Sequence, residues 1–447
     1  MKIVHHGAHK GVTGSCHELQ LDDSKSILID CGMFQGADAN NHRSMEIEFS
    51  IANVVALIVT HVHADHVGRI PFLFEAGFHG PIFCSIPTAR LLPIMLEDGI
   101  KLGITRNKEK IRKFMGDLKH RLRPIEFDEW VAIPSGAKIR LTPSGHILGA
   151  CVVEIDYNDE RFVFSGDIGS RHTPILFDPK SPDRADVLVL ESTYGDRIHE
   201  DREHRMGRLE SILCRTMENR GVTLIPAFSL GRTQELLYEL NRIFEEIEYK
   251  RSCTLIDKID VIVDSPMALK LTDVYNESKE HWDDDAKRVL SVDSQPLIFK
   301  NLIEIDESSA HRGTVDHLKR TGKPAIVIAG SGMCNGGRIM DYLKEFLDRE
   351  TTDVVFVGYQ AYGTLGRYIQ ESAGKPDAKV TIDHRQIPLR AKVHTLSGYS
   401  AHADQKDLIE FVTGMPSRPK LIRLVHGEDH PKEVLKGKLE ELGYVVG

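Results

Sequence analysis

The feature that most restricts this chain is a run of four metal-competent side chains within six residues, directly after an apolar segment. The apolar segment covers residues 54–59, and the polar run contains His61, His63, Asp65 and His66. Side chains at these spacings cannot all face one way on a regular helix or strand, so they must lie on a loop. There, the two histidines spaced two apart can chelate one ion while Asp65 and His66 reach another. Solvated loop histidines are the alternative, which suits a lone histidine better than this arrangement.

Two further residues extend the pattern, each beside a predicted strand. They are His146 in TPSGHILGA and Asp167 in FVFSGDIG. Alone, each is more simply explained as structural, but together with the first cluster they complete two ion sites. Imidazole and carboxylate ligands suit zinc, with manganese or iron as alternatives. We therefore expect two divalent ions, with Zn²⁺ as the first choice and Mn²⁺ as the second.

The chain changes its pattern twice. Its first half has short segments rich in β-branched residues between Gly, Pro and Asp turns, which predicts strands. From about residue 205 strands alternate with amphipathic helices, as in VTLIPAF followed by GRTQELLYELNRIFEEI. That alternation predicts βαβ units on a parallel, Rossmann-like sheet. After about residue 378 histidines again follow strand-like runs, in KVHTLSGYSAHAD and LIRLVHGEDH.

These changes predict an α/β protein whose second domain is inserted into the first. The expected boundaries are 1–204 for the first part of domain one, 205–377 for the inserted domain and 378–447 for the C-terminal part of domain one. A length of 447 residues agrees with two domains, because single hydrophobic cores stop growing below that size.

Charge and cysteine content narrow the class of protein. The 57 basic and 66 acidic residues give a net charge of −9, which argues against a protein that coats nucleic acid generally. Ions and a few arginines can still meet phosphates locally. The seven cysteines are scattered and odd in number, which favours reduced thiols. With no signal-like or membrane-spanning run, we expect a cytoplasmic protein without membrane contact.

The order of the motifs resembles the metallo-β-lactamase superfamily. Its pattern is an Asp after an early strand, then H-x-H-x-D-H, a His and an Asp, and this chain has Asp30, residues 61–66, His146 and Asp167. The resemblance implies an αββα sandwich. It also implies that His61, His63 and His146 hold one ion, Asp65 and His66 the other, and that Asp167 bridges. Asp30 would orient the ligand loop, a role that ligating histidines generally need.

Downstream residues resemble the β-CASP branch of that superfamily. Glu191 in VLESTYGDR, His402 in SGYSAHADQ and His426 in LVHGE look like its motifs A, B and C, with the inserted domain between A and B. The chain is similar to the group that includes the nuclease subunit of the cleavage and polyadenylation specificity factor and its short bacterial and archaeal homologues. His426 would complete the second ion's ligands. It favours RNA, because DNA-acting members have Val in motif C.

The resemblance implies a metal-dependent ribonuclease acting on single-stranded RNA. A hydroxide activated by two metal ions would attack phosphorus in line, leaving 5′-phosphate and 3′-hydroxyl ends. His402 would donate a proton to the departing oxygen, with Glu191 holding its ring, and Asp65 completes the expected catalytic set. The alternatives are a capping or packing histidine at 402 and a strand-end acid at 191.

Three strand-to-helix loops of the predicted inserted domain contain a Gly-Arg pair, at residues 229–232, 335–338 and 364–367. Glycine frees backbone N–H groups at a helix start, where anions bind, and arginine can grip a phosphate with two hydrogen bonds. Helix capping with a surface arginine explains any single loop. Three loops at one sheet edge favour a phosphate-binding rim facing the metals. The expected substrate-binding residues are Ser229, Arg232, Gly337, Arg338, Arg367 and Ser397.

Other functions stay open. A DNA nuclease of the same fold is disfavoured by His426. A scaffolding subunit of an RNA-processing complex would have lost ligands, and this chain has the full set. A small-ester hydrolase would lack the inserted domain. The sequence also leaves open a homodimer and the choice between internal and terminal cleavage.

Overall fold

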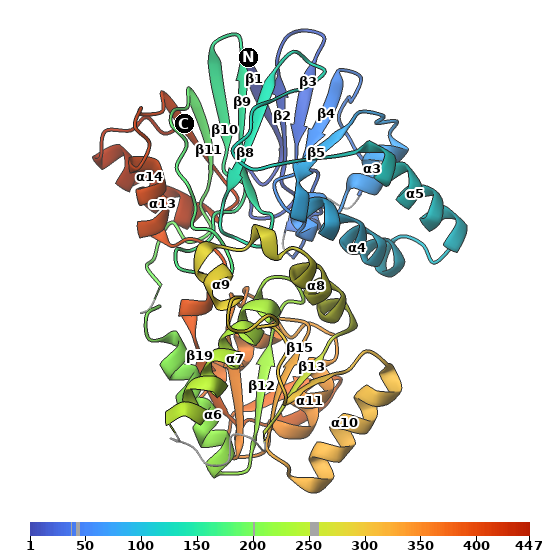
Figure 1. Ribbon diagram of the computed structural model, residues 1–447, viewed down its shortest axis with the longest axis vertical. Coiled ribbons are helices and arrows are strands. Elements are labelled where there is room, and N and C mark those ends of the chain that lie inside the picture. The colour runs from blue at the N-terminus through green and yellow to red at the C-terminus, as the bar shows by residue number, and fades with distance from the viewer. Residues whose placement is uncertain (37, 42–44, 200–201, 251–258) are drawn as a thin grey trace. The chain divides into compact units, whose positions relative to one another are not determined.

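The computed structural model describes residues 1–447 except 37, 42–44, 200–201 and 251–258. The chain divides into two compact units (Figure 1): unit 1 contains residues 1–198 and 402–447, and unit 2 contains residues 199–401. The sequence pattern predicted a return to the first domain at residue 378. The structure differs, because strand β19 (Lys392–Thr395) pairs in parallel with β16 (Thr352–Phe356) in the sheet of unit 2.

Unit 1 contains two six-stranded sheets, with strand orders β1-β2-β3-β4-β5-β6 and β20-β11-β10-β9-β8-β7. The strands of the first sheet are β1 (Lys2–Gly7), β2 (Cys16–Gln20), β3 (Ser26–Ile29), β4 (Val54–Ile58), β5 (Ile82–Ser85) and β6 (Leu122–Ile125). Those of the second are β7 (Val131–Ala132), β8 (Lys138–Pro143), β9 (Cys151–Tyr157), β10 (Glu160–Phe164), β11 (Val187–Glu191) and β20 (Leu421–Val425).

The core of unit 1 lies between these sheets. Ile27 and Ile29 of β3 and Val153 and Ile155 of β9 are fully buried in one cluster, because side chains two apart on a strand share a face. Helix α4 packs on β5 and β6 of the first sheet, and α13 and α14 cover the second. This confirms the predicted αββα sandwich. The helices of unit 1 are α1 (Asp38–Asn41), α2 (Ala64–Val67), α3 (Ile70–Glu75), α4 (Ile86–Gly103), α5 (Lys108–Arg121), α13 (Gln405–Thr413) and α14 (Asp429–Glu441).

Unit 2 is built on one parallel sheet with strand order β14-β13-β15-β12-β16-β19, which confirms the predicted Rossmann-like domain. The other strands are β12 (Val222–Pro226), β13 (Asp260–Asp264), β14 (Leu302–Glu304), β15 (Ala325–Ala329) and the hairpin β17 (Lys379–Ile382) with β18 (Arg385–Pro388). The helices are α6 (Arg205–Glu218), α7 (Arg232–Lys250), α8 (Pro266–Glu277), α9 (Asp284–Val289), α10 (Ser308–Thr321), α11 (Ile339–Phe346), α12 (Leu365–Ser372) and the short η2 (Lys279–His281) and η3 (Ser397–Tyr399).

Six cysteines are free thiols, five of them buried, and Cys253 lies outside the described residues. Within the same residues, no helix combines the length and apolar character needed to cross a membrane.

A buried ionic network ties together the loops at the carboxyl edge of the unit 2 sheet. Asp264, fully buried at the end of β13, accepts hydrogen bonds from His311 (2.6 Å), Tyr342 (2.6 Å) and Arg338 (2.7 Å). Arg338 also donates to the carbonyl oxygens of residues 305 and 306. One carboxylate therefore joins the loops that follow β13, β14 and β15.

Replacing Asp264 by Ala should destabilise unit 2 by about 3–5 kcal/mol, because it leaves an arginine without its buried partner. Asp260, at the other end of the same strand, pairs with Lys323 nearer the surface, so Asp260→Ala should cost less than about 1 kcal/mol. Chemical denaturation of both variants measures the difference. Equal losses would show that the network does not stabilise this edge.

Candidate metal centre

The motif residues of unit 1 converge because their strands run in one direction. Strands β3 and β4 are parallel, and so are β10, β11 and β20. Strand β8 runs the same way as β10, because both are antiparallel to β9. The loops that follow these strands therefore emerge at the same edge of their sheets. They hold Asp30, residues 61–66, His146, Asp167 and His426, with Glu191 at the end of β11.

One group of donor atoms lies beside the Oδ2 atom of the Asp167 carboxylate. Nδ1 of His63 is 3.1 Å from Nε2 of His61 and 3.0 Å from Nε2 of His146. Oδ2 of Asp167 lies 3.5 Å from each of these Nε2 atoms. The four donors lie close enough together to hold one ion.

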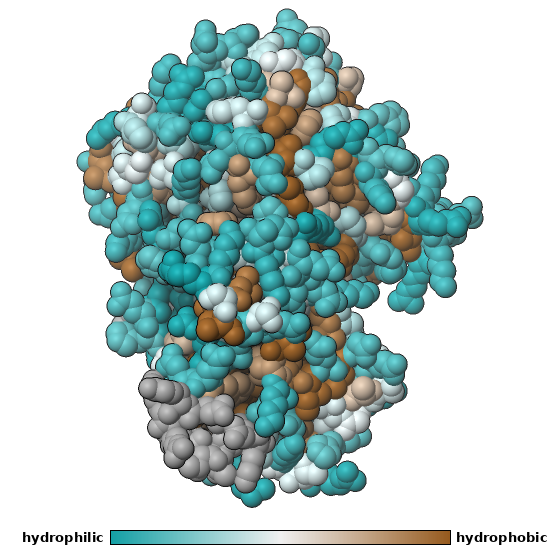
Figure 2. Space-filling view, viewed as in Figure 1, coloured by the Kyte–Doolittle hydropathy of each residue, from teal (hydrophilic) through white to brown (hydrophobic). Residues whose placement is uncertain are grey.

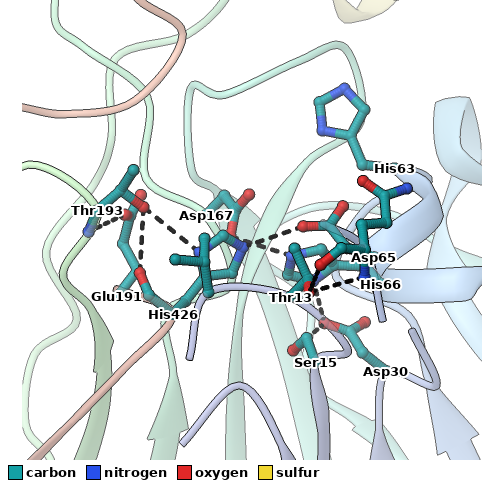
Figure 3. A network of polar contacts seen from close by, with 12 residues as sticks. Thr13, Ser15, Asp30, His63, Asp65, His66, Asp167, Glu191, Thr193 and His426 are labelled. Atoms are coloured by element: carbon teal, nitrogen blue, oxygen red, sulfur yellow. Dashed lines mark hydrogen bonds and ion pairs between the residues drawn. The ribbon is translucent and has the colours of Figure 1, made fainter. Parts of the chain in front are cut away.

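A second group lies on the other side of the same carboxylate (Figure 3). Oδ1 of Asp167 is 3.2 Å from Nε2 of His66 and 3.2 Å from Nε2 of His426. The Nε2 atom of His426 is also 3.4 Å from Oδ2 of Asp65. Asp167 thus turns one oxygen to each donor group, which is the arrangement that a bridging ligand needs.

The donors fit two metal ions. Atoms bound at about 2.0–2.1 Å to a tetrahedral zinc lie roughly 3.3 Å apart. Four spacings within the first group are 3.0–3.5 Å, and all of its donor atoms lie within 4.8 Å of one another. In the second group Asp167 Oδ1 lies 3.2 Å from both His66 Nε2 and His426 Nε2. These buried atoms nevertheless make no hydrogen bond within the described residues. Buried polar atoms normally have a partner, and cations shared by these atoms would provide it.

Asp30 holds the imidazole ring of His66, a member of the second group, in position. Its Oδ2 lies 2.7 Å from Nδ1 of His66 and accepts a 2.8 Å hydrogen bond from the hydroxyl of Thr60. The backbone N–H of Thr60 donates to Oδ1 at 2.8 Å. These contacts direct Nε2 of His66 toward Asp167.

His402 and Glu191 form a third group beside Asp167. Nδ1 of His402 is 3.2 Å from Oε1 of Glu191 and 4.0 Å from Oδ2 of Asp167. Glu191 is fully buried, and its carboxylate accepts the backbone N–H groups of Ile168 (2.7 Å) and Thr193 (3.1 Å). A carboxylate fixed in this way keeps the imidazole ring of His402 in one orientation.

The charge states of the histidines differ between the two donor groups. Burial lowers the pKa of His63 to about 4 and takes that of His61 well below its usual value. Burial acts in the same direction on His66 and His426, but the neighbouring carboxylates together outweigh it and raise both pKa values. They are Asp167 and Asp30 for His66, and Asp167 and Asp65 for His426, whose pKa is raised to about 9. For His402, burial lowers the pKa, and the Glu191 carboxylate more than offsets this, so the pKa is raised.

Sequence reasoning missed the neutral side chains that support the centre. The hydroxyl of Ser15 lies 3.5 Å from Asp30, and that of Thr193 lies 3.4 Å from Nδ1 of His426. Thr60 immediately precedes His61 and Thr193 follows Glu191 by two. Their adjacency to the motifs was the available signal, but hydroxyl residues are too common in loops for it to stand out.

The predicted substrate-binding residues all lie in unit 2. Arg232 is buried and pairs with Glu235, and Arg338 belongs to the Asp264 network. Both guanidinium groups thus have partners inside the unit, which differs from the phosphate-binding rim that the sequence pattern favoured. Arg367 is 45% exposed and pairs with Glu371.

The three other predicted substrate-binding residues shape loops. The hydroxyl of Ser229 is 3.0 Å from that of Ser265, and Ser397 begins the short helix η3. Gly337 has φ +75°, and a Cβ there would meet the carbonyl oxygen of Gly330 at 2.4 Å, so only glycine fits this turn.

Comparison with known proteins places three family profiles on the chain. They are the metallo-beta-lactamase superfamily over residues 10–203, the Beta-Casp domain over 233–369 and the Zn-dependent metallo-hydrolase RNA specificity domain over 386–446. Ribonuclease TTHA0252 of Thermus thermophilus is 36% identical, with 98% of this chain and 96% of that protein covered.

More distant relatives cover nearly the whole chain. Transcription termination factor FttA of Methanosarcina mazei is 30% identical, with 96% of this chain and 67% of that protein covered. Integrator complex subunit 11 of Danio rerio is 28% identical, with 99% and 71% covered. A solved structure of a protein of unknown function from Enterococcus faecalis shares the fold, with TM-score 0.58, 13% identity and coverage of 99% of this chain and 96% of that one.

Acidification should release an ion from Asp65, His66 and His426 before one from His61, His63 and His146. Imidazolium cannot ligate a metal, so the residues with raised pKa must lose protons on binding. Apparent affinity there should rise about tenfold per pH unit for each proton released, up to the pKa. His61 and His63 in the first group have pKa values lowered by burial, so they have no proton to lose and should change little between about pH 6 and pH 9. Equilibrium dialysis with metal analysis across this range measures both, and release in the opposite order would contradict the assignment.

Proposed function

Because the chain belongs to the β-CASP family of the metallo-β-lactamase superfamily, we propose that it is a metal-dependent ribonuclease that hydrolyses phosphodiester bonds of single-stranded RNA. The observation that carries this proposal is the single carboxylate of Asp167, turned toward two donor groups with the His402–Glu191 pair beside it. That combination offers two cation sites and a proton donor around one point. The names of the relatives, a ribonuclease among them, support RNA as the substrate.

Seven side chains would hold two divalent ions, with zinc as the first choice and manganese as the second. Bound there, the ions would make a nucleophile from water near neutral pH and offset the negative charge of the scissile phosphate. The first site would use His61, His63 and His146, the second Asp65, His66 and His426, and Asp167 would serve both.

His402 is the residue best suited to protonate the leaving oxygen. Nδ1–H of its ring donates to Glu191 Oε1 at 3.2 Å, so the proton for transfer is held at Nε2. The neighbouring carboxylate raises the pKa against the effect of burial, which keeps the ring charged at higher pH than an isolated buried histidine. A ring that keeps its proton to higher pH in this way suits general acid catalysis.

The purified protein loaded with zinc or manganese should cleave single-stranded RNA and leave DNA of the same sequence intact. The products should carry 5′-phosphate and 3′-hydroxyl ends. End-labelled substrates and metal analysis of the same sample measure cleavage and metal content together, and Asp167→Asn is the inactive control. A protein that carries two ions but cleaves neither polymer, or cleaves both equally, would overturn the proposal.

Replacing His402 by Ala should slow RNA cleavage by roughly 10²- to 10⁴-fold, the usual contribution of a positioned proton donor. Both ions should stay bound, because the ring lies 4.0 Å from Asp167 on the Glu191 side of the carboxylate. The loss should shrink on a nitrophenyl phosphodiester, whose leaving group needs no proton.

Two variants provide the comparison. His426→Ala should lose the second ion and regain activity in excess metal. His172→Ala should behave as wild type, because that side chain is 88% exposed. If His402→Ala is as impaired on the activated ester as on RNA, the residue is not the proton donor.

A further inference from the structure

The chain is acidic overall but contains one strongly basic segment in unit 1. Residues 101–123 contain nine lysines and arginines and two acidic residues, a net charge of +7, so the rest of a chain of −9 carries −16. The segment includes the end of α4, all of α5 and the start of β6. Hydrophilic residues cover the lobe at the right of Figure 2, where Figure 1 draws α5.

Helix α5 separates its apolar and basic residues. Asn107 caps it by accepting from the N–H groups of residues 109 and 110, and Ile111 and Leu118 are its buried side chains. Lys108, Arg112 and Lys119 all point to one flank of the remaining surface, at spacings of about 6 and 10 Å along the axis. We call these three residues the basic ridge.

The ridge has cations without acidic partners. Among the ion pairs of the described residues, none involves Lys108, Arg112 or Lys119, and none involves the neighbouring Arg106, Lys110 or Lys113. All six side chains belong to exposed residues. Uncompensated like charges repel one another on a folded surface, so their concentration on one helix of an acidic protein points to an anionic ligand.

A hollow of about 500 Å³ continues the basic surface at the carboxyl end of α5. Its lining includes His79, His120, Arg121 and Arg123. Arg121 donates to Nδ1 of His79 at 3.0 Å and lies over the ring of Phe74. These contacts hold a guanidinium group in place at the hollow, where a phosphate could reach it.

The basic surface is tied to the metal centre through α4. Ser85, the N-cap of α4, and Thr88 in its first turn both donate to the carbonyl oxygen of Gly149, at 2.6 and 3.0 Å. Gly149 follows His146 by three residues in the same loop. Helix α4 is 18 residues long, or about 27 Å, and packs against α5. The helix pair therefore extends from the His146 loop to the basic ridge.

We propose that the basic ridge and the hollow beside it bind the phosphates of an RNA strand outside the metal centre. The inference rests on the proposed ribonuclease function, and it adds a second place at which the substrate is held. A row of lysine and arginine side chains along one helix flank suits a polyanion without sequence preference. A strand that contacts both places would be bound more tightly than its scissile phosphate alone allows.

The test is the salt dependence of binding to a labelled, hydrolysis-resistant phosphorothioate RNA of about 40 nucleotides. In the triple variant Lys108→Ala, Arg112→Ala, Lys119→Ala, the slope of log affinity against log salt should fall by about 2, at 0.7 for each lost phosphate contact. Between about 50 and 500 mM salt the variant should then lose about a hundredfold less affinity than wild type. Alanine is the strongest helix former, so α5 should remain folded.

A charge-matched control removes three lysines from α13 and α14, at the opposite side of unit 1 in Figure 1. The changes Lys406→Ala, Lys436→Ala and Lys438→Ala alter the net charge equally but should leave the slope near wild type. A gain variant uses Gly116, which lies four residues after Arg112 and has nothing within 4 Å of an added Cβ. Gly116→Lys should steepen the slope by about 0.7 relative to Gly116→Ala.

The outcomes separate the two proposals. Wild type that binds no RNA overturns the ribonuclease function and this inference with it. Salt-dependent binding by wild type that is unchanged in the ridge variant, or weakened equally by the control, overturns the inference alone. In that case α5 is a solvated face or a surface for an acidic protein.

Discussion

The carboxylate of Asp167 presents one oxygen to each of two histidine groups, and the strand ends of unit 1 are arranged around it. A buried carboxylate without compensating charge is strongly unfavourable. Here the compensation comes from His66 after β4 and His426 after β20, whose pKa values are raised. These residues can reach Asp167 only if both sheets keep their register. The packing of the sandwich and the chemistry of its edge therefore depend on each other.

Two ligand-loop residues adopt a backbone conformation that L-amino acids avoid. Asp30 has φ +61° and His426 has φ +50°, which costs of order 1–3 kcal/mol for each residue. Backbone hydrogen bonds hold both in place: the N–H of Asp30 donates to Ile58 and that of His426 donates to Ala8. This conformation turns both side chains toward the cluster as each strand ends, so the local strain serves the geometry of the metal centre.

Charge is distributed unevenly in a way that suits a polyanionic substrate. A chain of net charge −9 would repel RNA on average, and the attraction must come from local positive charge. The two donor groups would supply it at the centre once ions are bound, and α5 supplies it on the same unit. In unit 2 the arginines of two Gly-Arg loops pair with acidic residues of the same unit. Composition and motif alone therefore overestimated how many arginines are free to bind phosphate.

The sequence by itself indicated the candidate ligand residues, the strands and the presence of a parallel second domain, because each of them depends on the local spacing of residues. The H-x-H-x-D-H run, the strand-end acids and the strand–helix alternation can each be recognised within a short stretch of sequence. Only the tertiary structure decided which oxygen of Asp167 faces which histidines, and that Glu191 meets His402 across 211 residues. It also decided that Arg232 is buried, that Arg338 serves Asp264, and that the chain leaves unit 2 at residue 401 instead of 377. Those outcomes depend on which distant segments pack together, and a local pattern does not encode its distant partner.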